Sequence, residues 1–291
     1  MQFGILYSYW SREWACDLEG YAKIIKKVSD LGFDILEISA HHVYEMSQDE
    51  LRKLNALAQE RGITFTTNSG PAEQYDLASP DPAVRKQGIQ YFNTILEKMQ
   101  LIQAKVLVGA IYSHWPCNFK ETDKQAAWER SISCLQEIGR TAEGLGMEIA
   151  LEVLNRNETY ILTTADEAVE YCQRVGSPSV KILLDTYHMN IEEDDLQAAI
   201  QQAGGLLGHV HVGECNRKLP GMNNSIDWAG LGQALRAVGY EGAVVMEPFM
   251  LPGGSVGDSI RVWRDLSGGA GEEQLDRYAA QSLTFLKEKL L

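Results

Sequence analysis

The chain has 291 residues, of which 45% are hydrophobic and 23% charged, a composition typical of a folded globular protein rather than a disordered one. The formal net charge of −14 at pH 7 disfavours binding to the phosphate backbone of nucleic acids. The five cysteines form no paired motif, and the N-terminus lacks the pattern of a secretory signal. We therefore expect a reduced, cytoplasmic protein without a disulfide framework, a membrane span or a nucleic-acid partner.

Short apolar runs alternate with longer amphipathic stretches along the chain, as in repeated strand–helix units with a parallel sheet. In chain order, strands are expected near residues 2–8, 34–39, 63–68, 105–110, 147–153, 180–185, 207–212 and 242–248. Helices are expected near residues 15–31, 48–61, 82–102, 122–145, 164–175, 194–203, 228–238 and 273–289. Eight such units need about 250 residues. The sequence therefore predicts an α/β fold, a single-domain (β/α)8 TIM barrel over residues 1–291.

A glycine-rich segment, residues 252–271, follows the eighth expected strand. It lacks the Gly-Lys-Ser/Thr ending of a phosphate-binding loop. We therefore expect a long loop at the active site or at a dimer contact.

Four expected strands carry a possible metal ligand near their C-terminal ends: Glu152, Asp185, His211 and Glu247. Each interval between these ligands has room for about one strand, loop and helix. The C-terminal ends of the strands of a parallel barrel converge on one face, where such folds keep their active sites. Taken singly, a carboxylate at a strand end more often caps a helix or lies in a solvated loop. Together, the four predict one cation held by three carboxylates and an imidazole.

The alternation of side chains along a strand gives these ligands a direction. It places Glu152 and Glu247 toward the barrel interior, where a buried carboxylate needs a partner or a metal. His209 and His211 share one face of the seventh strand, and only His211 is close to its C-terminal end. We expect His211 to be the ligand and His209 to be a hydrogen-bonded histidine behind it.

Three oxygen ligands and one nitrogen, with no thiolate, favour a divalent ion such as Mn²⁺, Co²⁺ or Mg²⁺ over a structural zinc. Such an ion would stabilise the charge that develops when a C–H beside a carbonyl loses its proton. Glu152 and Glu247 come from the fifth and eighth strands, which allows them to flank a substrate. One would remove a proton and the other would return one to the opposite face, which predicts an epimerase.

Four phrases in the second half are long and specific: LEVLNRNE (151–158), LLDTYHMNIEED (183–194), GHVHVGECNRKLPG (208–221) and VVMEPFMLPGG (244–254). With these phrases the chain resembles the ketose 3-epimerase family, the D-tagatose and D-allulose (D-psicose) 3-epimerases of the xylose isomerase-like barrel group. The resemblance runs from the first strand to the last helix. It implies an isomerase, a homodimer or homotetramer, that interconverts free ketohexoses at C3 with Mn²⁺ or Co²⁺, such as D-fructose/D-allulose and D-tagatose/D-sorbose.

The resemblance also implies roles for individual residues. It repeats the four metal ligands and makes Glu152 and Glu247 the catalytic pair, which exchanges the C3 proton through a cis-enediolate whose O2 and O3 the metal holds. Glu158, His188 and Arg217 would bind the oxygens around C1 and C2, a role that their donors and acceptors allow. Without the resemblance, Glu158 and Arg217 are equally consistent with charged residues of a surface loop, and His188 with a residue that packs within a loop.

Further side chains near the expected barrel mouth are pocket candidates: Leu6, Trp14, Gly109, Trp115, Asn157 and Phe249. The aromatic ones would cover the apolar faces of a sugar, or simply pack in the core. The family usually has an aromatic residue in place of Leu6, a Phe or Tyr in place of Asn157, and a Pro-Trp step where this chain reads Asp227-Trp228. We expect Leu6 and Asn157 to reshape the pocket around C4 to C6 and to alter the preferred sugar.

Two other functions remain open from the residues alone. The first is a sugar isomerase of the same barrel group, such as an aldose–ketose, inosose or hydroxypyruvate enzyme. The second is a non-catalytic sugar-binding barrel with a retained metal, although binding alone needs no second proton-transfer group. A DNA-repair endonuclease of this group would need a richer zinc cluster and a basic groove, which the charge of −14 disfavours.

Overall fold

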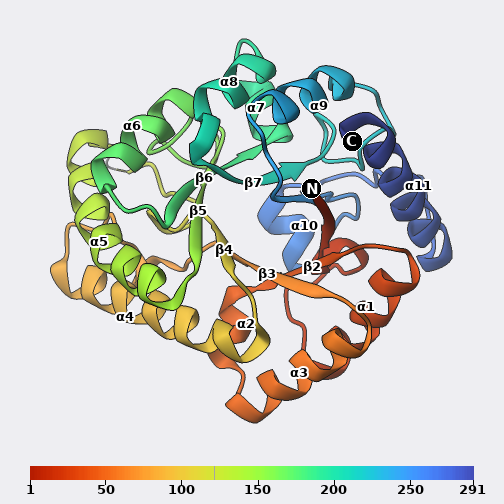
Figure 1. Cartoon of the computed structure of the whole chain (residues 1–291), viewed down its shortest axis with the longest axis horizontal. Helices are drawn as coiled ribbons and strands as arrows, with labels where there is room; N and C mark the ends of the chain where they lie inside the picture. The colour runs from red at the N-terminus through yellow and green to blue at the C-terminus, as the bar shows by residue number, and fades with distance from the viewer. Residues whose placement is uncertain (121) are drawn as a thin grey trace.

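The computed structural model describes residues 1–120 and 122–291, and within them the strands close into one parallel barrel (Figure 1). Each strand pairs with the next, and β8 pairs with β1 to close the ring. The strands are β1 Gln2–Leu6, β2 Ile35–Ser39, β3 Thr64–Ser69, β4 Val106–Gly109, β5 Glu148–Val153, β6 Val180–Asp185, β7 Leu207–Val212 and β8 Ala243–Met246. The prediction of a TIM barrel is confirmed.

Helices surround the barrel and follow the predicted order. They are α1 Leu18–Asp30, α2 Ala40–Glu45, α3 Gln48–Glu60, α4 Pro82–Met99, α5 Lys124–Leu145, α6 Ala165–Val175, α7 Thr186–Glu192, α8 Leu196–Ala203, α9 Trp228–Ala237, α10 Gly254–Ile260 and α11 Glu272–Leu290. The short helices α2, α7 and α10 were not predicted. They lie in the connections after β2, β6 and β8, on the side of the barrel where the C-terminal ends of the strands lie.

Local sequence signals explain where the helices begin and end. Asp17 caps α1 by accepting a hydrogen bond from the backbone N–H of Gly20. Ser47 and Glu50 form a reciprocal capping box at the start of α3. Helix α5 ends at Gly146, whose φ of 61° is a left-handed conformation that favours glycine. These caps set one end of each of the three helices.

Two strands end two residues earlier than predicted. The first strand was expected to reach residue 8, but it ends at Leu6 because Tyr7–Trp10 forms a 3₁₀ turn. The eighth was expected to reach residue 248, but β8 ends at Met246, before a proline at 248 that cannot donate to a strand ladder. Both differences place polar side chains on loops at the barrel mouth.

The barrel interior is layered. A small apolar cluster inside it contains Val108, Ala150 and Leu183, with Val106 packed against it. Two residues further along the same strands come Glu152 on β5 and Asp185 on β6. Polar groups therefore replace the apolar filling toward the C-terminal ends of the strands.

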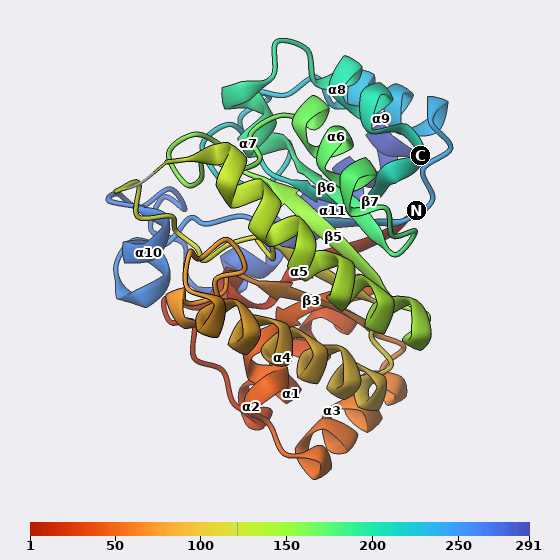
Figure 2. The same ribbon diagram turned by 90° about the vertical axis from the view of Figure 1, so that its left-hand side faces the viewer.

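Figure 2 shows the N-terminus at one end of the barrel and α10 at the opposite end, where the strands terminate. None of the helices in residues 1–120 and 122–291 combines the length and the apolar character that crossing a membrane requires.

Candidate metal centre and active site

The four predicted ligands meet at the C-terminal mouth of the barrel. Glu152, Asp185, His211 and Glu247 each offer a ligand atom, and these atoms lie within 4.8 Å of one another. All four side chains are buried. Glu247 lies one residue beyond β8, where its backbone N–H donates to the carbonyl of Val212 at 3.1 Å. Residues far apart in the sequence are thus brought together because their strands are neighbours.

The imidazole of His211 shows that this cluster fits a cation. Its Nδ1 is buried and has no hydrogen-bond partner within the described residues. This nitrogen lies 3.5 Å from Glu152 Oε1 and 3.7 Å from Glu247 Oε1. The buried carboxylates and the unpartnered ring nitrogen offer electron pairs to a cation. The donor set of oxygens and one imidazole suits a divalent ion.

Glu37 on β2, which was not predicted as a site residue, holds the other side of His211. Its Oε1 lies 2.9 Å from His211 Nε2, and its side chain is 0% exposed. A carboxylate at this nitrogen takes the N–H of the ring and leaves the Nδ1 lone pair directed at the cluster. Glu37 was hidden in an apolar run, ILEIS, as a single charged residue.

Several donors converge on the two oxygens of Glu37. The oxygens accept hydrogen bonds from Thr66 Oγ1 at 2.8 Å and from Asn68 Nδ2 at 3.1 Å. The Nε2 of His209 lies 3.1 Å away, so His209 sits behind His211. Burial alone would raise the pKa of Glu37, but the imidazoles of His211 and His209 hold it well below its ordinary value. Glu37 is therefore a fixed negative charge beneath the cluster of predicted ligands.

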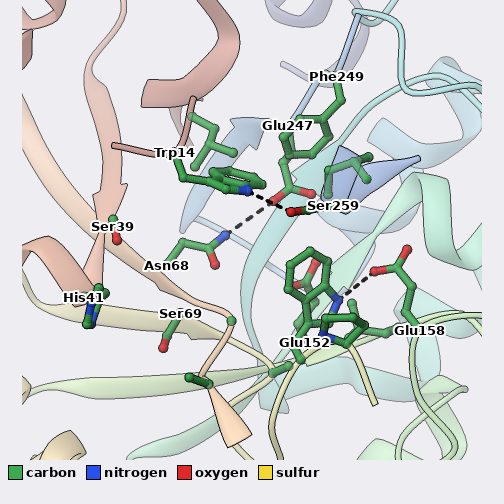
Figure 3. Close-up of a pocket in the computed structure, with 18 of the residues that line it drawn as sticks. Trp14, Ser39, His41, Asn68, Ser69, Glu152, Glu158, Glu247, Phe249 and Ser259 are labelled. Atoms are coloured by element: carbon green, nitrogen blue, oxygen red, sulfur yellow. Dashed lines mark hydrogen bonds between the residues drawn. The ribbon is translucent and has the colours of Figure 1, made fainter. Parts of the chain in front are cut away.

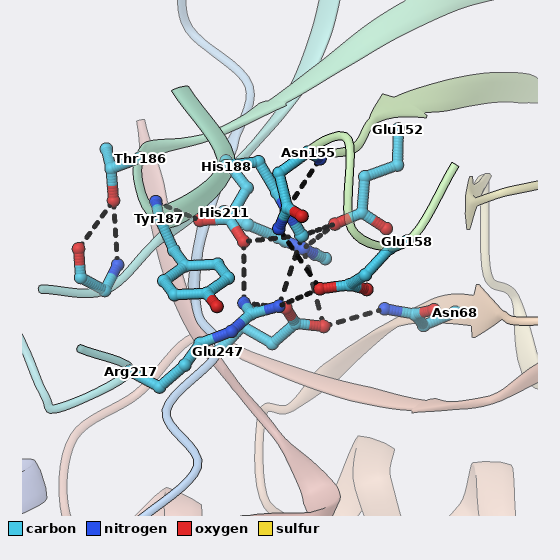
Figure 4. Close-up of polar contacts among 12 residues, drawn as sticks. Asn68, Glu152, Asn155, Glu158, Thr186, Tyr187, His188, His211, Arg217 and Glu247 are labelled. Carbon is cyan, nitrogen blue, oxygen red and sulfur yellow. Dashed lines mark hydrogen bonds and ion pairs between the residues drawn. The ribbon is translucent and has the colours of Figure 1, made fainter. Parts of the chain in front are cut away.

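Arg217 bridges two of the ligands (Figure 4). Its Nη1 donates to Asp185 Oδ2 and to Glu247 Oε2, both at 2.8 Å. Its guanidinium lies 3.8 Å from the ring centroid of Tyr187, a cation–π contact. The backbone at Arg217 has a φ of 64°, a strained conformation for a residue with a Cβ, of the kind that clusters at functional sites. This turn aims the guanidinium across the barrel mouth.

His188 and Glu158 lie beside Arg217. The Nε2 of His188 is 3.1 Å from Arg217 Nη2, and its Nδ1 accepts the backbone N–H of Asn155 at 3.1 Å. Burial and the guanidinium hold the pKa of His188 well below its ordinary value, so the ring is neutral. Glu158 accepts hydrogen bonds from Trp115 Nε1 at 2.8 Å and from Asn155 Nδ2 at 3.2 Å. Polar groups of both signs thus line one side of the cluster.

The two glutamates of the cluster have perturbed acidities. Burial raises the pKa of Glu152, and nearby Asp185 raises it further, against the effect of His211. Burial also raises the pKa of Glu247, to about 8, with the charge of Glu152 adding to the effect and His211 opposing it. Carboxyl groups with a raised pKa are better able to donate a proton as well as accept one.

A cavity of about 410 Å³ opens onto the cluster (Figure 3). Glu152, Glu158, His188, Arg217 and Glu247 all contribute to its lining. The predicted pocket residues that also line it are Leu6, Trp14, Trp115 and Phe249. The rings of Trp14 and Phe249 meet edge to face, with centroids 5.8 Å apart. Apolar walls around a few convergent polar groups are typical of a small-molecule site.

The structure corrects the prediction for two pocket residues. Gly109 does not line the cavity. Its φ is 117°, and a Cβ there would lie 2.2 Å from the carbonyl oxygen of Ser69, so its role is to let β4 pass close to β3. Asn157 is also outside the lining, because it is exposed in a turn where its backbone N–H donates to Asn155 Oδ1 at 2.9 Å.

The glycine-rich segment 252–271 reaches the cavity through α10. Ser259 and Ile260 belong to the cavity lining. Trp14 donates from its backbone N–H to Ser255 Oγ at 2.9 Å and from its Nε1 to Ser259 Oγ at 3.2 Å. Of the two predictions for this segment, these contacts support the active-site loop.

The sequence matches the family described as the xylose isomerase-like TIM barrel over residues 25–266. The D-psicose 3-epimerase of Ruminiclostridium cellulolyticum is 46% identical over 286 residues, which cover 98% of this chain and 96% of that protein. The D-psicose 3-epimerase of Agrobacterium fabrum is 43% identical over 286 residues, with 98% of each chain covered. The crystal structure of D-psicose 3-epimerase with D-tagatose from Clostridium cellulolyticum H10 has a TM-score of 0.97 at 45% identity, covering 100% of this chain and 99% of that chain. The chain therefore belongs to the ketose 3-epimerase family of xylose isomerase-like TIM barrels and is an isomerase that epimerises carbohydrates.

Proposed function

We propose that the protein epimerises free ketohexoses at C3, interconverting pairs such as D-fructose and D-allulose or D-tagatose and D-sorbose. The observation that carries this proposal is the pair Glu152 and Glu247. Both carboxyl groups are buried in one cluster with a raised pKa, and they reach it from different strands of the barrel wall. Binding alone needs no second proton-transfer group, whereas inversion at one carbon does.

The proposed reaction assigns a task to each polar group. Glu158, His188 and Arg217 bind the oxygens around C1 and C2 and orient the substrate. One glutamate of the pair takes the C3 proton, which leaves a cis-enediolate, and the other returns a proton to the opposite face. The two exchange roles in the reverse direction. A divalent cation, when bound, supplies positive charge that stabilises the developing enediolate.

For the cation we propose Mn²⁺ or Co²⁺, with Mg²⁺ as the alternative. The residues that would hold it are Glu152, Asp185, His211 and Glu247. Oxygen donors with one imidazole select this class of ions, and cellular availability often decides within it. The homodimer or homotetramer expected from the family resemblance is tested by the native mass of the purified enzyme.

The proposed function is tested with metal-stripped enzyme and a panel of ketohexoses and ketopentoses. Mn²⁺, Co²⁺ or Mg²⁺ is added back separately, and the products are separated by chromatography. A 3-epimer formed only after metal addition supports the proposal. An aldose product would identify an isomerase that moves the carbonyl, and full activity after verified metal removal would contradict the metal-dependent reaction.

A further inference from the structure

The cavity is larger than the proposed substrate needs. At about 30 Å³ for a group the size of a water molecule, the six carbon units of a ketohexose fill roughly 180 Å³. The cavity has a volume of about 410 Å³. A space of similar size to the sugar itself is therefore left over. The residues that surround this space differ from those at the metal ligands.

The extra space is lined mainly by aromatic and hydroxyl-bearing side chains, and we name it the distal lobe. Its residues are Ser39, His41, His42, Ala72, Tyr75 and Tyr91. They come from the end of β2, from α2, from the 3₁₀ turn Glu73–Tyr75 and its preceding residue, and from α4. Among the described residues that line the whole cavity, the only Lys or Arg is Arg217, which lies at the metal ligands. The residues named for the lobe thus include no Lys or Arg to bind a phosphate group.

The aromatic wall of the lobe is closely packed. The rings of Tyr75 and Tyr91 stack at 3.8 Å between centroids with an angle of 6° between their planes. The Tyr91 hydroxyl lies 3.2 Å from His41 Nδ1, and both tyrosines are buried. The His41 side chain is 51% exposed, so the lobe opens to solvent at that end. Aromatic edges with polar tips fit a sugar ring, which has apolar C–H groups and hydroxyl edges.

The lobe also lies in the direction of the far end of the substrate. In Figure 3, Glu158 lies on one side of the pair Glu152 and Glu247, and Ser39 and His41 lie on the other. In the proposed function, Glu158 belongs to the group that binds the C1 and C2 end. The carbons C4 to C6 then extend from the glutamate pair toward the distal lobe.

We propose that the distal lobe binds a neutral glycosyl group attached at the C6 end of the ketose. In addition to free ketohexoses, the enzyme then accepts 6-O-glycosyl ketoses as ligands and substrates. This inference rests on the proposed function. The reaction at C3 is unchanged, because the C3 proton is lost and returned while the glycosidic bond stays intact. The substituent only adds contacts beyond C6.

The test uses the Mn²⁺-loaded full-length enzyme with D-fructose, its 6-O-glucosyl derivative isomaltulose and its 3-O-glucosyl derivative turanose. The two disaccharides have the same size, but the substituent of turanose is on the reacting carbon. Exchange of the C3 proton in D₂O is followed by NMR, and competition against D-fructose is measured. Isomaltulose is expected to undergo exchange or to inhibit competitively, and turanose is expected to undergo no exchange.

Two variants locate the effect. Ala72 is exposed, and Ala72→Trp fills the lobe from this position. For isomaltulose, the variant is expected to lower kcat/KM, or to raise the inhibition constant, at least tenfold. Turnover of D-fructose is expected to stay within twofold of wild type. Ala83→Trp is the matched control, because Ala83 is exposed and is not among the residues that line the cavity. His41→Ala is a second variant, which removes part of the lobe wall without adding bulk.

The inference is overturned if D-fructose is epimerised while isomaltulose neither reacts nor inhibits, or if Ala72→Trp leaves the response to isomaltulose unchanged. Failure with D-fructose and every other ketohexose would instead refute the proposed function on which the inference rests.

Discussion

Replacing Glu37 by Gln is expected to weaken metal binding while the barrel stays folded. Glu37 is not among the residues that line the cavity, but its Oε1 lies 2.9 Å from His211 Nε2 and leaves Nδ1 facing Glu152 and Glu247. Loss of such a carboxylate behind a ligating histidine typically lowers metal affinity by about 10- to 100-fold. This corresponds to about 1.4–2.8 kcal/mol of binding free energy.

The contacts of Glu37 explain why Gln is the informative substitution. Gln keeps one acceptor oxygen, and the Thr66 hydroxyl, now 2.8 Å from the carboxylate, is able to rotate and accept from the new amide. Glu37→Leu is the matched contrast, because it leaves Thr66 Oγ1 and His211 Nε2 without their acceptor. Each buried donor left unpaired costs about 1–3 kcal/mol, so the Leu variant is expected to lose fold stability as well.

The assay is calorimetric titration of metal-free enzyme with Mn²⁺, together with thermal unfolding with and without the metal. The Gln variant is expected to show a Kd raised about 10- to 100-fold and a near-normal melting temperature without metal. Mn²⁺ affinity within twofold of wild type would refute the reasoning that Glu37 orients His211.

Three further predictions follow from the cluster. Burial raises the pKa of Glu247 from 4.5 to about 8, so metal binding displaces a proton and Mn²⁺ affinity is expected to rise between pH 5 and 8. The stability that this group contributes to the metal-free protein is complete below pH 4.5 and is lost as pH rises through 8, so the melting temperature without metal is expected to fall over the same range. Calorimetry in buffers of different ionisation enthalpy that detects no proton release on Mn²⁺ binding at pH 7 would contradict this. A lysine at position 217 cannot donate to Asp185 and Glu247 in the geometry of the arginine, and a hydrogen bond to a charged group contributes about 1.5–3 kcal/mol. Arg217→Lys is therefore expected to raise KM about tenfold in steady-state assays, and an unchanged KM and kcat would argue against the role of Arg217 in substrate binding. The amide of Asn68 lies between Glu37 and Glu247, at 3.1 Å and 3.4 Å, so Asn68→Asp is expected to lower kcat more than Asn68→Ala does, and the reverse order would show that the contact is electrostatically unimportant.

The sequence was sufficient to predict the barrel and the convergence of Glu152, Asp185, His211 and Glu247 in one cluster, for a physical reason. Strand side chains alternate with a period of two, and parallel strands end on one face, so charged residues at the ends of apolar runs converge there. The raised pKa of Glu152 and Glu247 reflects the burial on which this argument depended. The loop sequences said less about local structure. The helices α2, α7 and α10 were not predicted because they are too short to show a clear hydrophobic periodicity.

Glu37 was missed although the same reasoning applied to it. It is a lone carboxylate in an apolar strand, and its side chain must be partnered if buried. Its partners His209 and His211 lie on β7, across the barrel interior, and sequence spacing does not reveal such pairs. Asn157 was misplaced because it follows Asn155, whose side chain folds the turn and turns the next residues outward.

The central claim is that two carboxylates exchange the C3 proton of a ketohexose. The most direct test is NMR of D-fructose in D₂O with Mn²⁺-loaded wild-type, Glu152→Gln and Glu247→Gln enzymes, with Mn²⁺ content verified for each. The account predicts deuterium at C3 together with formation of D-allulose for the wild type, and rates about 10²- to 10⁴-fold lower for either Gln variant, as expected for the loss of a general acid–base group. Deuterium incorporated at C1, or near-wild-type C3 exchange by metal-loaded Glu247→Gln, would contradict it.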